Sequence, residues 1–305
     1  MLRVALAPTP ARPWAAAAVE AGGAQLVDPP EAEVLIFMAP DDTDGLARAL
    51  KEAPDAKWVQ LPWAGIEAFV TAGVLDPSRT WTCGKGVYAE PVAEHALALA
   101  LAGLRDLPQR IRATTWEAQG GVSLYDGKAT ILGGGGITEC LLQLLRPMRT
   151  EVTVVRRETT VSLNGAARVV GPDLLHDALG TADAVFLALA LTPETTGIID
   201  AAALRAMEPH AWLVNVARGA HVVTDDLVRA LTEGWIGGAG LDVTDPEPLP
   251  DGHRLWSLPN CIITPHTANS QEMGLPLLAK RVTENLRRYA AGEPLVGLVD
   301  LDAGY

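Results

Sequence analysis

The feature that most constrains this chain is a glycine run, Gly133-Gly134-Gly135-Gly136, placed between a strand pattern and a helix pattern. The apolar segment 129–132 leads into the run, and Glu139–Met148 continues from it as a predicted helix. A strand, a tight glycine turn and a helix form the context of a dinucleotide-binding loop. Gly133 permits the sharp turn, and Gly135 lets the backbone approach a pyrophosphate at the helix N-terminus.

The third glycine position of this fingerprint is occupied by Thr138, whose side chain we expect to push the helix and the strand slightly apart. Gly136 and Ile137 open the helix and, with Gly133 and Gly135, are the expected contacts to the cofactor. A glycine run by itself is equally compatible with a flexible loop. The flanking strand and helix patterns favour the cofactor site.

Short apolar runs alternate with helical patterns along the whole chain, which predicts an α/β fold of parallel sheets. The expected strands of the first series are Arg3–Leu6, Gln25–Val27, Val34–Phe37 and Trp58–Leu61. Those of the second series are Ala129–Leu132, Val152–Val155, Ala184–Leu187, Trp212–Val216, Ile236–Leu241 and Cys261–Thr264. Each series predicts a Rossmann-like, doubly wound domain.

A single long helix over Pro91–Arg112 is expected between the two series, with its proline in the first turn. The final helix, 271–290, is followed by an apolar tail, Leu295–Leu301, that has no evident partner in the second series. We therefore expect the tail to return to the first domain. This gives a discontinuous domain of residues 1–90 and 270–305, with the nucleotide-binding domain, 91–269, inserted into it.

The choice of nicotinamide cofactor depends on the residue at the end of the strand that follows the glycine loop. Counted from Gly133, that position is Arg156, and Arg157 follows it. An acidic residue would bind the two ribose hydroxyls of NAD, whereas two guanidinium groups suit the 2′-phosphate of NADP. We therefore expect NADP, with NAD as the alternative. The other interpretation is a pair of solvated surface arginines, one of which pairs with Glu158.

An arginine, two carboxylates and a histidine come directly after three predicted strands. Arg218 follows 212–216, Asp242 and Glu247 follow the next strand, and His266 follows the last. Because ligands of doubly wound sheets bind beyond the carboxyl ends of the strands, we expect these side chains at the edge that holds the glycine loop. Each of them alone is more often a solvated charge or a loop residue, so the prediction rests on their convergence.

Together these residues suit the reduction of a 2-keto acid. Arg218 can hold the carboxylate and polarise the ketone while it stays charged. His266 can donate a proton to the developing alkoxide, and Glu247 against the imidazole would favour its charged form and fix its orientation. The hydride would come from the cofactor.

Composition excludes several other classes of function. The net charge of −13, without a basic patch, argues against binding of nucleic acid. The cysteines Cys83, Cys140 and Cys261 lack metal-ligand spacing, so we expect free thiols in a reducing cytoplasm and no metal site. The most apolar stretch, Val92–Leu104, contains Glu94 and His95 and is too short to cross a bilayer. No signal peptide and no membrane association are expected.

Several ordered motifs make the chain resemble the D-isomer-specific 2-hydroxyacid dehydrogenase family over essentially its whole length. The matching stretches are Trp58–Glu67, Val92–His95, the glycine loop, Leu191–Thr195, Asn215–Gly219, Asp242–Pro248 and Thr264–His266. The resemblance implies a substrate domain made of both chain ends. It also assigns Arg218, Glu247 and His266 the catalytic roles given above.

Further residues receive roles only through this resemblance. Leu189, Thr195 and Val216 would line the cofactor, and Asp242 would contact the nicotinamide amide. Ala64, Gly65 and Ile66 would bind the substrate carboxylate. Family members are commonly homodimers that pair through a helix and arm, here about Val92–Gly127.

Two departures and one branch distinction qualify what the resemblance implies. Besides Thr138, Tyr88 stands where many relatives have an asparagine near the substrate, and Glu247 argues against the formate-oxidising branch. The chain ends soon after its last helix, so we expect no regulatory domain. The favoured function is reduction of small 2-keto acids such as glyoxylate or hydroxypyruvate. The alternative is a non-enzymatic, cofactor-sensing interaction protein.

Overall fold

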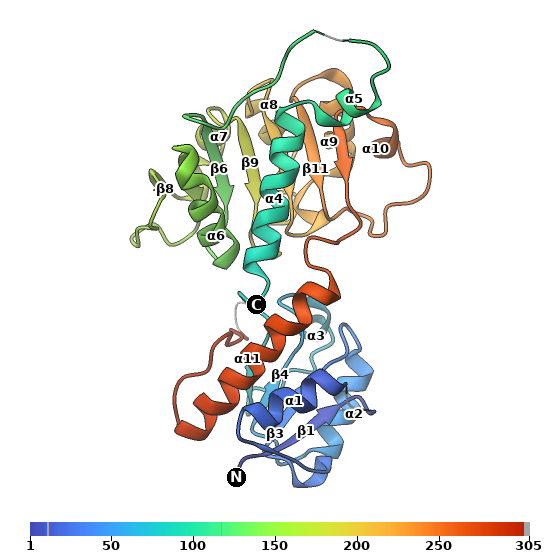
Figure 1. Ribbon diagram of the computed structural model, residues 1–305, viewed down its shortest axis with the longest axis vertical. Helices are drawn as coiled ribbons and strands as arrows, with labels where there is room; N and C mark the ends of the chain where they lie inside the picture. Colours follow the sequence, from blue (N-terminus) through green and yellow to red (C-terminus); the bar gives the residue numbers. More distant parts are fainter. Residues whose placement is uncertain (11, 117, 302–305) are drawn as a thin grey trace. The chain divides into compact units, whose positions relative to one another are not determined.

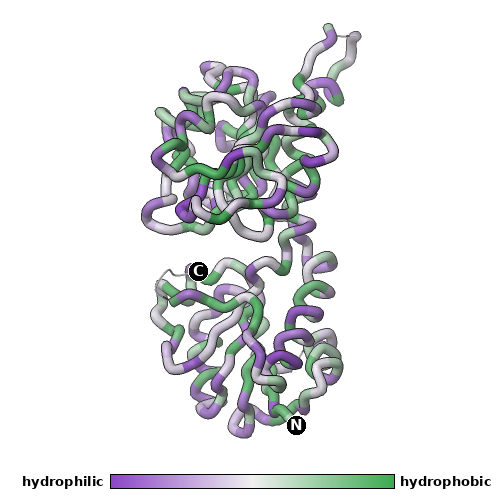
Figure 2. Tube along the Cα trace, turned by 90° about the vertical axis from the view of Figure 1, so that its left-hand side faces the viewer, coloured by the Kyte–Doolittle hydropathy of each residue, from purple (hydrophilic) through white to green (hydrophobic). Residues whose placement is uncertain are grey.

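The computed structural model describes residues 1–10, 12–116 and 118–301, and the chain divides into two compact units. Unit 1 consists of residues 1–88 together with the described residues from Ser270 onward, and unit 2 consists of Ala89–Asn269. The first boundary thus follows Tyr88 rather than residue 90. Figure 2 shows hydrophobic stretches running through the interior of each unit, with hydrophilic stretches mainly in its outer loops and helices.

Unit 1 contains a parallel sheet of five described strands in the order β2-β1-β3-β4-β5. The strands are β1 (Arg3–Ala7), β2 (Gln25–Leu26), β3 (Val34–Phe37), β4 (Trp58–Gln60) and β5 (Thr80–Thr82). The helices are α1 (Pro13–Ala21), α2 (Thr43–Glu52), α3 (Glu67–Thr71), α11 (Gln271–Ala291) and the 3-10 turn η1 (Pro29–Glu31).

Both faces of the first sheet are covered because successive strand residues point to opposite sides. Val34 and Ile36 of β3 pack with residues of α1 and α11 on one face. Leu35 and Phe37 pack with α2 and α3 on the other. A strand buried on both faces reads as a continuous apolar run, which is the pattern seen in the sequence of β3.

The apolar tail after α11 lies on unit 1. Leu298 forms an antiparallel bridge with Thr82 of β5, and the Val299 amide donates to the Trp81 carbonyl at 3.0 Å. Val299 and Leu301 also pack against the core beneath α2 and α3. The two ends of the chain are therefore held in one unit, as Figure 1 shows by their blue and red ribbons.

Unit 2 contains a parallel sheet of seven described strands in the order β12-β11-β10-β9-β6-β7-β8. The strands are β6 (Lys128–Leu132), β7 (Glu151–Val155), β8 (Arg168–Val170), β9 (Ala184–Leu187), β10 (Trp212–Asn215), β11 (Gly238–Leu241) and β12 (Cys261–Ile263). Helices α4 (Ala89–Leu104) and α6 (Gly136–Leu145) cover one face of the sheet. Helices α7 (Leu175–Leu179), α8 (Ala201–Ala206) and α9 (Thr224–Glu233) cover the other.

The remaining elements of unit 2 are short. They are α5 (Leu107–Arg112), α10 (Arg254–Ser257) and the 3-10 turns η2 (Arg146–Met148), η3 (Pro172–Leu174) and η4 (Gly219–His221).

The strand order places a topological switch point between β6 and β9. From β6 the chain continues outward to β7 and β8, and from β9 it continues the opposite way to β10, β11 and β12. Loops that leave such a pair of strands diverge, and ligands of this fold class bind in the crevice between them. The two units confirm the predicted α/β architecture of parallel, Rossmann-like sheets.

The prediction of one long helix over 91–112 is wrong. Helix α4 ends at Leu104, Asp106 adopts a left-handed conformation (φ 52°), and α5 begins at Leu107. Pro108 explains the break, since it has no N–H to donate to the Leu104 carbonyl four residues earlier. That carbonyl instead accepts from the Val122 amide at 2.7 Å.

Candidate functional site

The glycine loop joins β6 to α6 at the switch point. Gly133 has φ 113°, a value that side chains disfavour, and an added Cβ there would collide with the carbonyl of Ala188, just after β9. Gly135 is the N-cap residue of α6, and an added Cβ would meet no atom within 4 Å. Glycine is thus required at position 133, where the glycine loop touches the loop after β9. At Gly135 the space beside the backbone is empty.

The N-terminus of α6 suits an anion. No side chain caps this end of the helix, which begins with Gly136 and Ile137, so the first amides are left to a ligand. Thr138 is fully buried, and its hydroxyl donates to the Gly133 carbonyl at 3.0 Å. The hydroxyl of this buried threonine therefore has a hydrogen-bond partner, and the bond joins the start of α6 to the start of the glycine loop. The residues present fit the pyrophosphate of a dinucleotide.

The predicted ribose position lies beside this loop. The Arg156 side chain runs across Gly134, where an added Cβ would lie 2.7 Å from the arginine Cδ, and its Nε donates to the Glu158 carbonyl. The Arg157 charge contributes to lowering the pKa of Glu194, after hydrogen bonds from Thr192 and the Glu194 backbone. The contact of Arg156 with Glu158 is one that the alternative of two surface arginines also predicts.

The segment that follows β9 forms a compact loop. The Thr195 hydroxyl donates to the Ala190 carbonyl at 2.8 Å and accepts from the Thr192 amide at 2.8 Å. Both predicted cofactor-lining residues of this loop, Leu189 and Thr195, offer their carbonyl oxygens to the ring of His221, at 3.3 and 3.0 Å.

The predicted catalytic side chains follow three neighbouring strands, β10, β11 and β12. His266 and Glu247 are in contact, with 2.6 Å between the imidazole Nδ1 and the carboxylate Oε1. Because a carboxylate only accepts, Nδ1 carries the proton and Nε2 is the ring atom left for a substrate. Both side chains are about half exposed, at 54% and 40%, so a ligand can reach them.

Arg218 follows β10 in an extended conformation (φ −140°, ψ 145°). The Asn215 side chain holds the turn before it by donating to the Arg218 carbonyl and accepting from the Ala217 amide. Arg218 Nη1 donates to the Ala217 carbonyl at 2.8 Å. Val216, in the same turn, is buried.

Asp242, after β11, holds the loop that carries His266. It is 3% exposed, and its carboxylate accepts from the Thr264 hydroxyl (2.6 Å) and from the amides of Thr267 (2.9 Å) and Ala268 (3.0 Å). Burial by itself would raise the pKa of Asp242, but these hydrogen bonds and one from His95 outweigh it and lower the pKa. The same loop holds His266 in a left-handed conformation, φ 49°.

Comparison with known proteins identifies the family. The family model described as "D-isomer specific 2-hydroxyacid dehydrogenase, NAD binding domain" matches residues 95–268. The chain belongs to the D-isomer specific 2-hydroxyacid dehydrogenase family. It is accordingly a nicotinamide-dependent oxidoreductase that acts on a small acid.

Individual relatives agree with this family over most of the chain. An uncharacterized protein of Corynebacterium melassecola is 38% identical over 297 residues, which are 95% of each chain. A glyoxylate/hydroxypyruvate reductase A of Photorhabdus laumondii is 33% identical over 255 residues, 79% of each chain. A crystal structure of a D-isomer specific 2-hydroxyacid dehydrogenase from Xanthobacter autotrophicus Py2, in complex with NADPH and MES, superposes with a TM-score of 0.86 and 27% identity over 99% of each chain.

Two histidines to which we assigned no role from the sequence lie at the same sheet edge of this dehydrogenase. His95 of α4 bonds through Nε2 to the Thr264 hydroxyl at 2.9 Å and lies 3.5 Å from Asp242 Oδ1. His221 is fully buried. His95 belongs to one of the motifs that match the family, and His221 comes three residues after Arg218. The sequence signals that could have pointed to these histidines are the family motif for His95 and the closeness to Arg218 for His221.

In unit 1 the segment assigned to the substrate carboxylate, Ala64 to Ile66, precedes α3, with Ile66 as its N-cap residue. Tyr88 supports this segment: its hydroxyl donates to the Pro62 carbonyl at 2.7 Å, and its ring lies 5.2 Å from that of Trp63. Burial raises the pKa of Tyr88, so the phenol stays protonated. Tyr88, which departs from the family pattern, therefore makes contacts that support the neighbouring backbone of Pro62 and Trp63.

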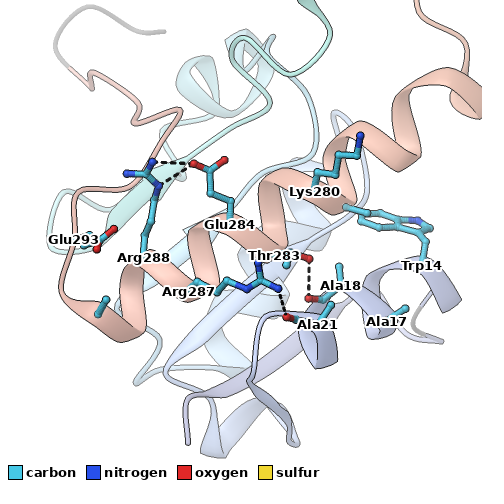
Figure 3. Close-up of a pocket in the computed structure, with 12 residues that line it drawn as sticks. Trp14, Ala17, Ala18, Ala21, Lys280, Thr283, Glu284, Arg287, Arg288 and Glu293 are labelled. Carbon is cyan, nitrogen blue, oxygen red and sulfur yellow. Dashed lines mark hydrogen bonds and ion pairs between the residues drawn. The ribbon is translucent and has the colours of Figure 1, made fainter.

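Unit 1 also contains a groove of about 840 Å³ between α1 and α11. Figure 3 shows that three of its charged side chains bond within the protein: Arg288 pairs with Glu284, and Arg287 donates to the Ala21 carbonyl. We assign no chemistry to it.

Among the described residues, no three His, Cys, Asp or Glu side chains gather as metal ligands, and no helix is long and apolar enough to cross a membrane.

Proposed function

We propose that this dehydrogenase works as a reductase of small 2-keto acids, with glyoxylate and hydroxypyruvate as its first candidates and a D-hydroxy acid as product. The observation that carries the proposal is the contact of His266 with Glu247 beyond the carboxyl end of β12. It supplies an oriented proton donor two strands away from Arg218. The name of the Photorhabdus relative supports these two substrates, which the sequence also favours.

Each side chain of the trio has a distinct task in this proposal. Arg218 binds the substrate carboxylate and polarises the ketone oxygen. Glu247 keeps the His266 proton on Nδ1 and stabilises the ring when it is charged, so that Nε2 can donate a proton to the ketone oxygen. The nicotinamide, when bound, supplies the hydride.

We infer that NADPH is preferred over NADH. The Arg156 side chain lies against Gly134, beside the loop proposed to hold the pyrophosphate, and Arg157 follows it. Two cations at this position suit a 2′-phosphate by charge. The Xanthobacter relative, whose crystal structure contains NADPH, supports the same preference.

The other cofactor residues are part of the same proposal. Gly133, Gly135, Gly136 and Ile137 hold the pyrophosphate, whereas Leu189, Thr195 and Val216 line the remainder of the cofactor. For Asp242 we propose contact with the nicotinamide amide, as the family resemblance implies.

We further propose that unit 1 is the substrate domain and unit 2 the cofactor domain. The family model for the NAD-binding domain lies within the range of unit 2, which supports the second assignment. Binding of the substrate carboxylate by Ala64, Gly65 and Ile66 stays a prediction from the family resemblance.

We also propose a homodimer that pairs through the arm of about Val92–Gly127. Support comes from Ile111 and Trp116, which are 80% and 100% exposed in the single chain. Large apolar side chains this exposed within one segment are typical of a protein interface. A cytoplasmic location stays a prediction, consistent with three unpaired cysteines.

The decisive experiment mixes the purified protein with NADPH or NADH and a panel of 2-keto acids and follows absorbance of the reduced nicotinamide. We expect turnover with NADPH and the smallest keto acids. Absence of turnover with every acid and either cofactor would overturn the proposal. Cofactor binding without turnover would favour the sensing protein instead.

A further inference from the structure

His221 is a polar side chain in a buried position. It is fully buried at the end of η4, and neighbouring Val222 belongs to the core beneath α8 and α9. Burying an imidazole costs free energy unless its nitrogens are hydrogen-bonded. Here both ring nitrogens face carbonyl oxygens, with Nδ1 3.0 Å from Thr195 and Nε2 3.3 Å from Leu189.

The two carbonyls are the ends of one loop, residues 189–195. A neutral imidazole has one N–H and can donate to one of them, and a protonated ring can donate to both. In either state the ring bonds the loop to η4. A second hydrogen bond lies within the loop, where the Thr195 hydroxyl donates to the Ala190 carbonyl.

This loop and η4 belong to the two halves of the proposed site. The loop begins directly after Ala188, whose carbonyl is in contact range of Gly133 in the glycine loop. The turn η4 begins directly after Arg218, and the His221 amide donates back to the Arg218 carbonyl at 3.2 Å. One residue therefore connects the two segments: the His221 ring contacts the cofactor loop, and the His221 amide contacts the backbone of the arginine proposed to bind substrate.

We propose that His221 is a positioning residue that couples the cofactor-lining loop 189–195 to the Arg218 turn. The inference rests on the proposed function, because it needs a dinucleotide to bind at this edge. It assigns His221 no contact with substrate or cofactor. Removing the ring donors should loosen the loop and weaken the binding of NADPH.

The test compares His221→Phe, which keeps a ring and removes both ring nitrogens, with His221→Gln, which keeps a side-chain amide that can donate to a carbonyl. His210→Phe is the matched control. Its Nε2 bonds to Asp183 at 2.7 Å, ahead of β9 and β10 and therefore at the opposite edge of the sheet. Two readouts are used on folded protein: amide hydrogen exchange of residues 188–198 without cofactor, and the Kd of NADPH from its fluorescence.

For His221→Phe we expect exchange of the 188–198 amides to rise about tenfold and the Kd to rise about tenfold, as loss of one or two hydrogen bonds implies. His221→Gln should fall between wild type and His221→Phe, and His210→Phe should match wild type in both. Unchanged exchange or unchanged Kd in His221→Phe overturns the coupling while the proposed function stands.

Two further outcomes are distinguishable. If His221→Phe does not fold, His221→Gln and the wild-type protein decide: NADPH should slow exchange in both 188–198 and 219–223, and protection confined to one segment overturns the inference. If wild type binds neither NADPH nor NADH, the proposed function fails and this coupling fails with it.

Discussion

The Thr138 hydroxyl donates a hydrogen bond to the Gly133 carbonyl at 3.0 Å, across the loop in which threonine replaces the third fingerprint glycine. Thr138 is fully buried, so replacing its hydroxyl with the methyl of Thr138→Val leaves that carbonyl without this donor at nearly constant shape. We expect a loss of about 1 kcal/mol in the free energy of unfolding, measured by urea denaturation. Thr138→Ala, which removes the buried methyl group as well, should lose more. A Thr138→Val variant as stable as the wild type would contradict the role of the bond.

This pair of residues also shows where sequence reasoning stopped. The glycine spacing predicted the loop, and counting from Gly133 placed Arg156 beside it. The rotamer of Thr138 could not be predicted, because whether its hydroxyl points at a carbonyl depends on the distance between helix and strand. The sequence therefore indicated a steric conflict where the structure has a hydrogen bond.

The fold was predictable where the apolar pattern is strong. Val34–Phe37 and Ala184–Leu187 begin and end as expected, because both are short apolar runs buried on two faces. The edge strands β5 (Thr80–Thr82) and β8 (Arg168–Val170) were missed, since three residues with polar members carry no periodicity. The break after Leu104 was readable from Pro108, but the apolar pattern on both sides of it favoured one helix.

The candidate site was predictable as a set of strand ends rather than as a set of contacts. Parallel strands bring Arg218, Glu247 and His266 to one edge whatever the details of the loops. The contacts by which Asp242 holds the His266 loop could not be predicted. They depend on the side-chain conformation of a buried carboxylate, which accepts from the amides of Thr267 and Ala268.

Asp242 predicts a pH-dependent contribution to stability. Its pKa is lowered from the ordinary 3.8, so its carboxylate stabilises the folded protein above that value and loses this effect as pH falls through the folded pKa. Asp242→Asn should therefore cost about 2 kcal/mol in unfolding free energy near pH 7 and distinctly less near pH 3. Urea denaturation across this pH range measures the difference in unfolding free energy between wild type and variant. A difference that is constant with pH would show that the charge is not involved.

Cofactor preference should depend on the two arginines after β7. Arg156→Asp combined with Arg157→Ala replaces cations with a carboxylate that favours ribose hydroxyls. We expect the ratio of kcat/KM for NADPH over NADH to fall by about 100-fold, since two charge-assisted contacts are lost. Arg168→Ala, at the start of β8 and so at the opposite edge of the sheet, is the control. An unchanged ratio in the double variant would refute the ribose assignment.

The proposed dimer arm offers a separate test. Ile111→Glu with Trp116→Glu places charges on two side chains that are 80% and 100% exposed in the single chain, so the fold of the monomer should tolerate them. Buried in an interface, the same charges would be unpaired and should abolish pairing. Sedimentation velocity should give a dimer for wild type and a monomer for the variant. A wild-type monomer would contradict the proposal.

His266 should affect turnover far more than cofactor binding. Removing the imidazole in His266→Ala deletes the proton donor that Glu247 orients at 2.6 Å, and a lost general acid typically costs about 10²- to 10⁴-fold in kcat. Glu247→Gln keeps an oxygen acceptor for Nδ1 but not the charge, so its loss in kcat should be smaller. His176→Ala, on an exposed position of α7, is the histidine control and should resemble wild type. The Kd of NADPH should stay within about twofold in all three variants. Parallel losses in kcat and cofactor affinity for His266→Ala would mean that the residue maintains the loop 264–268 rather than donating a proton.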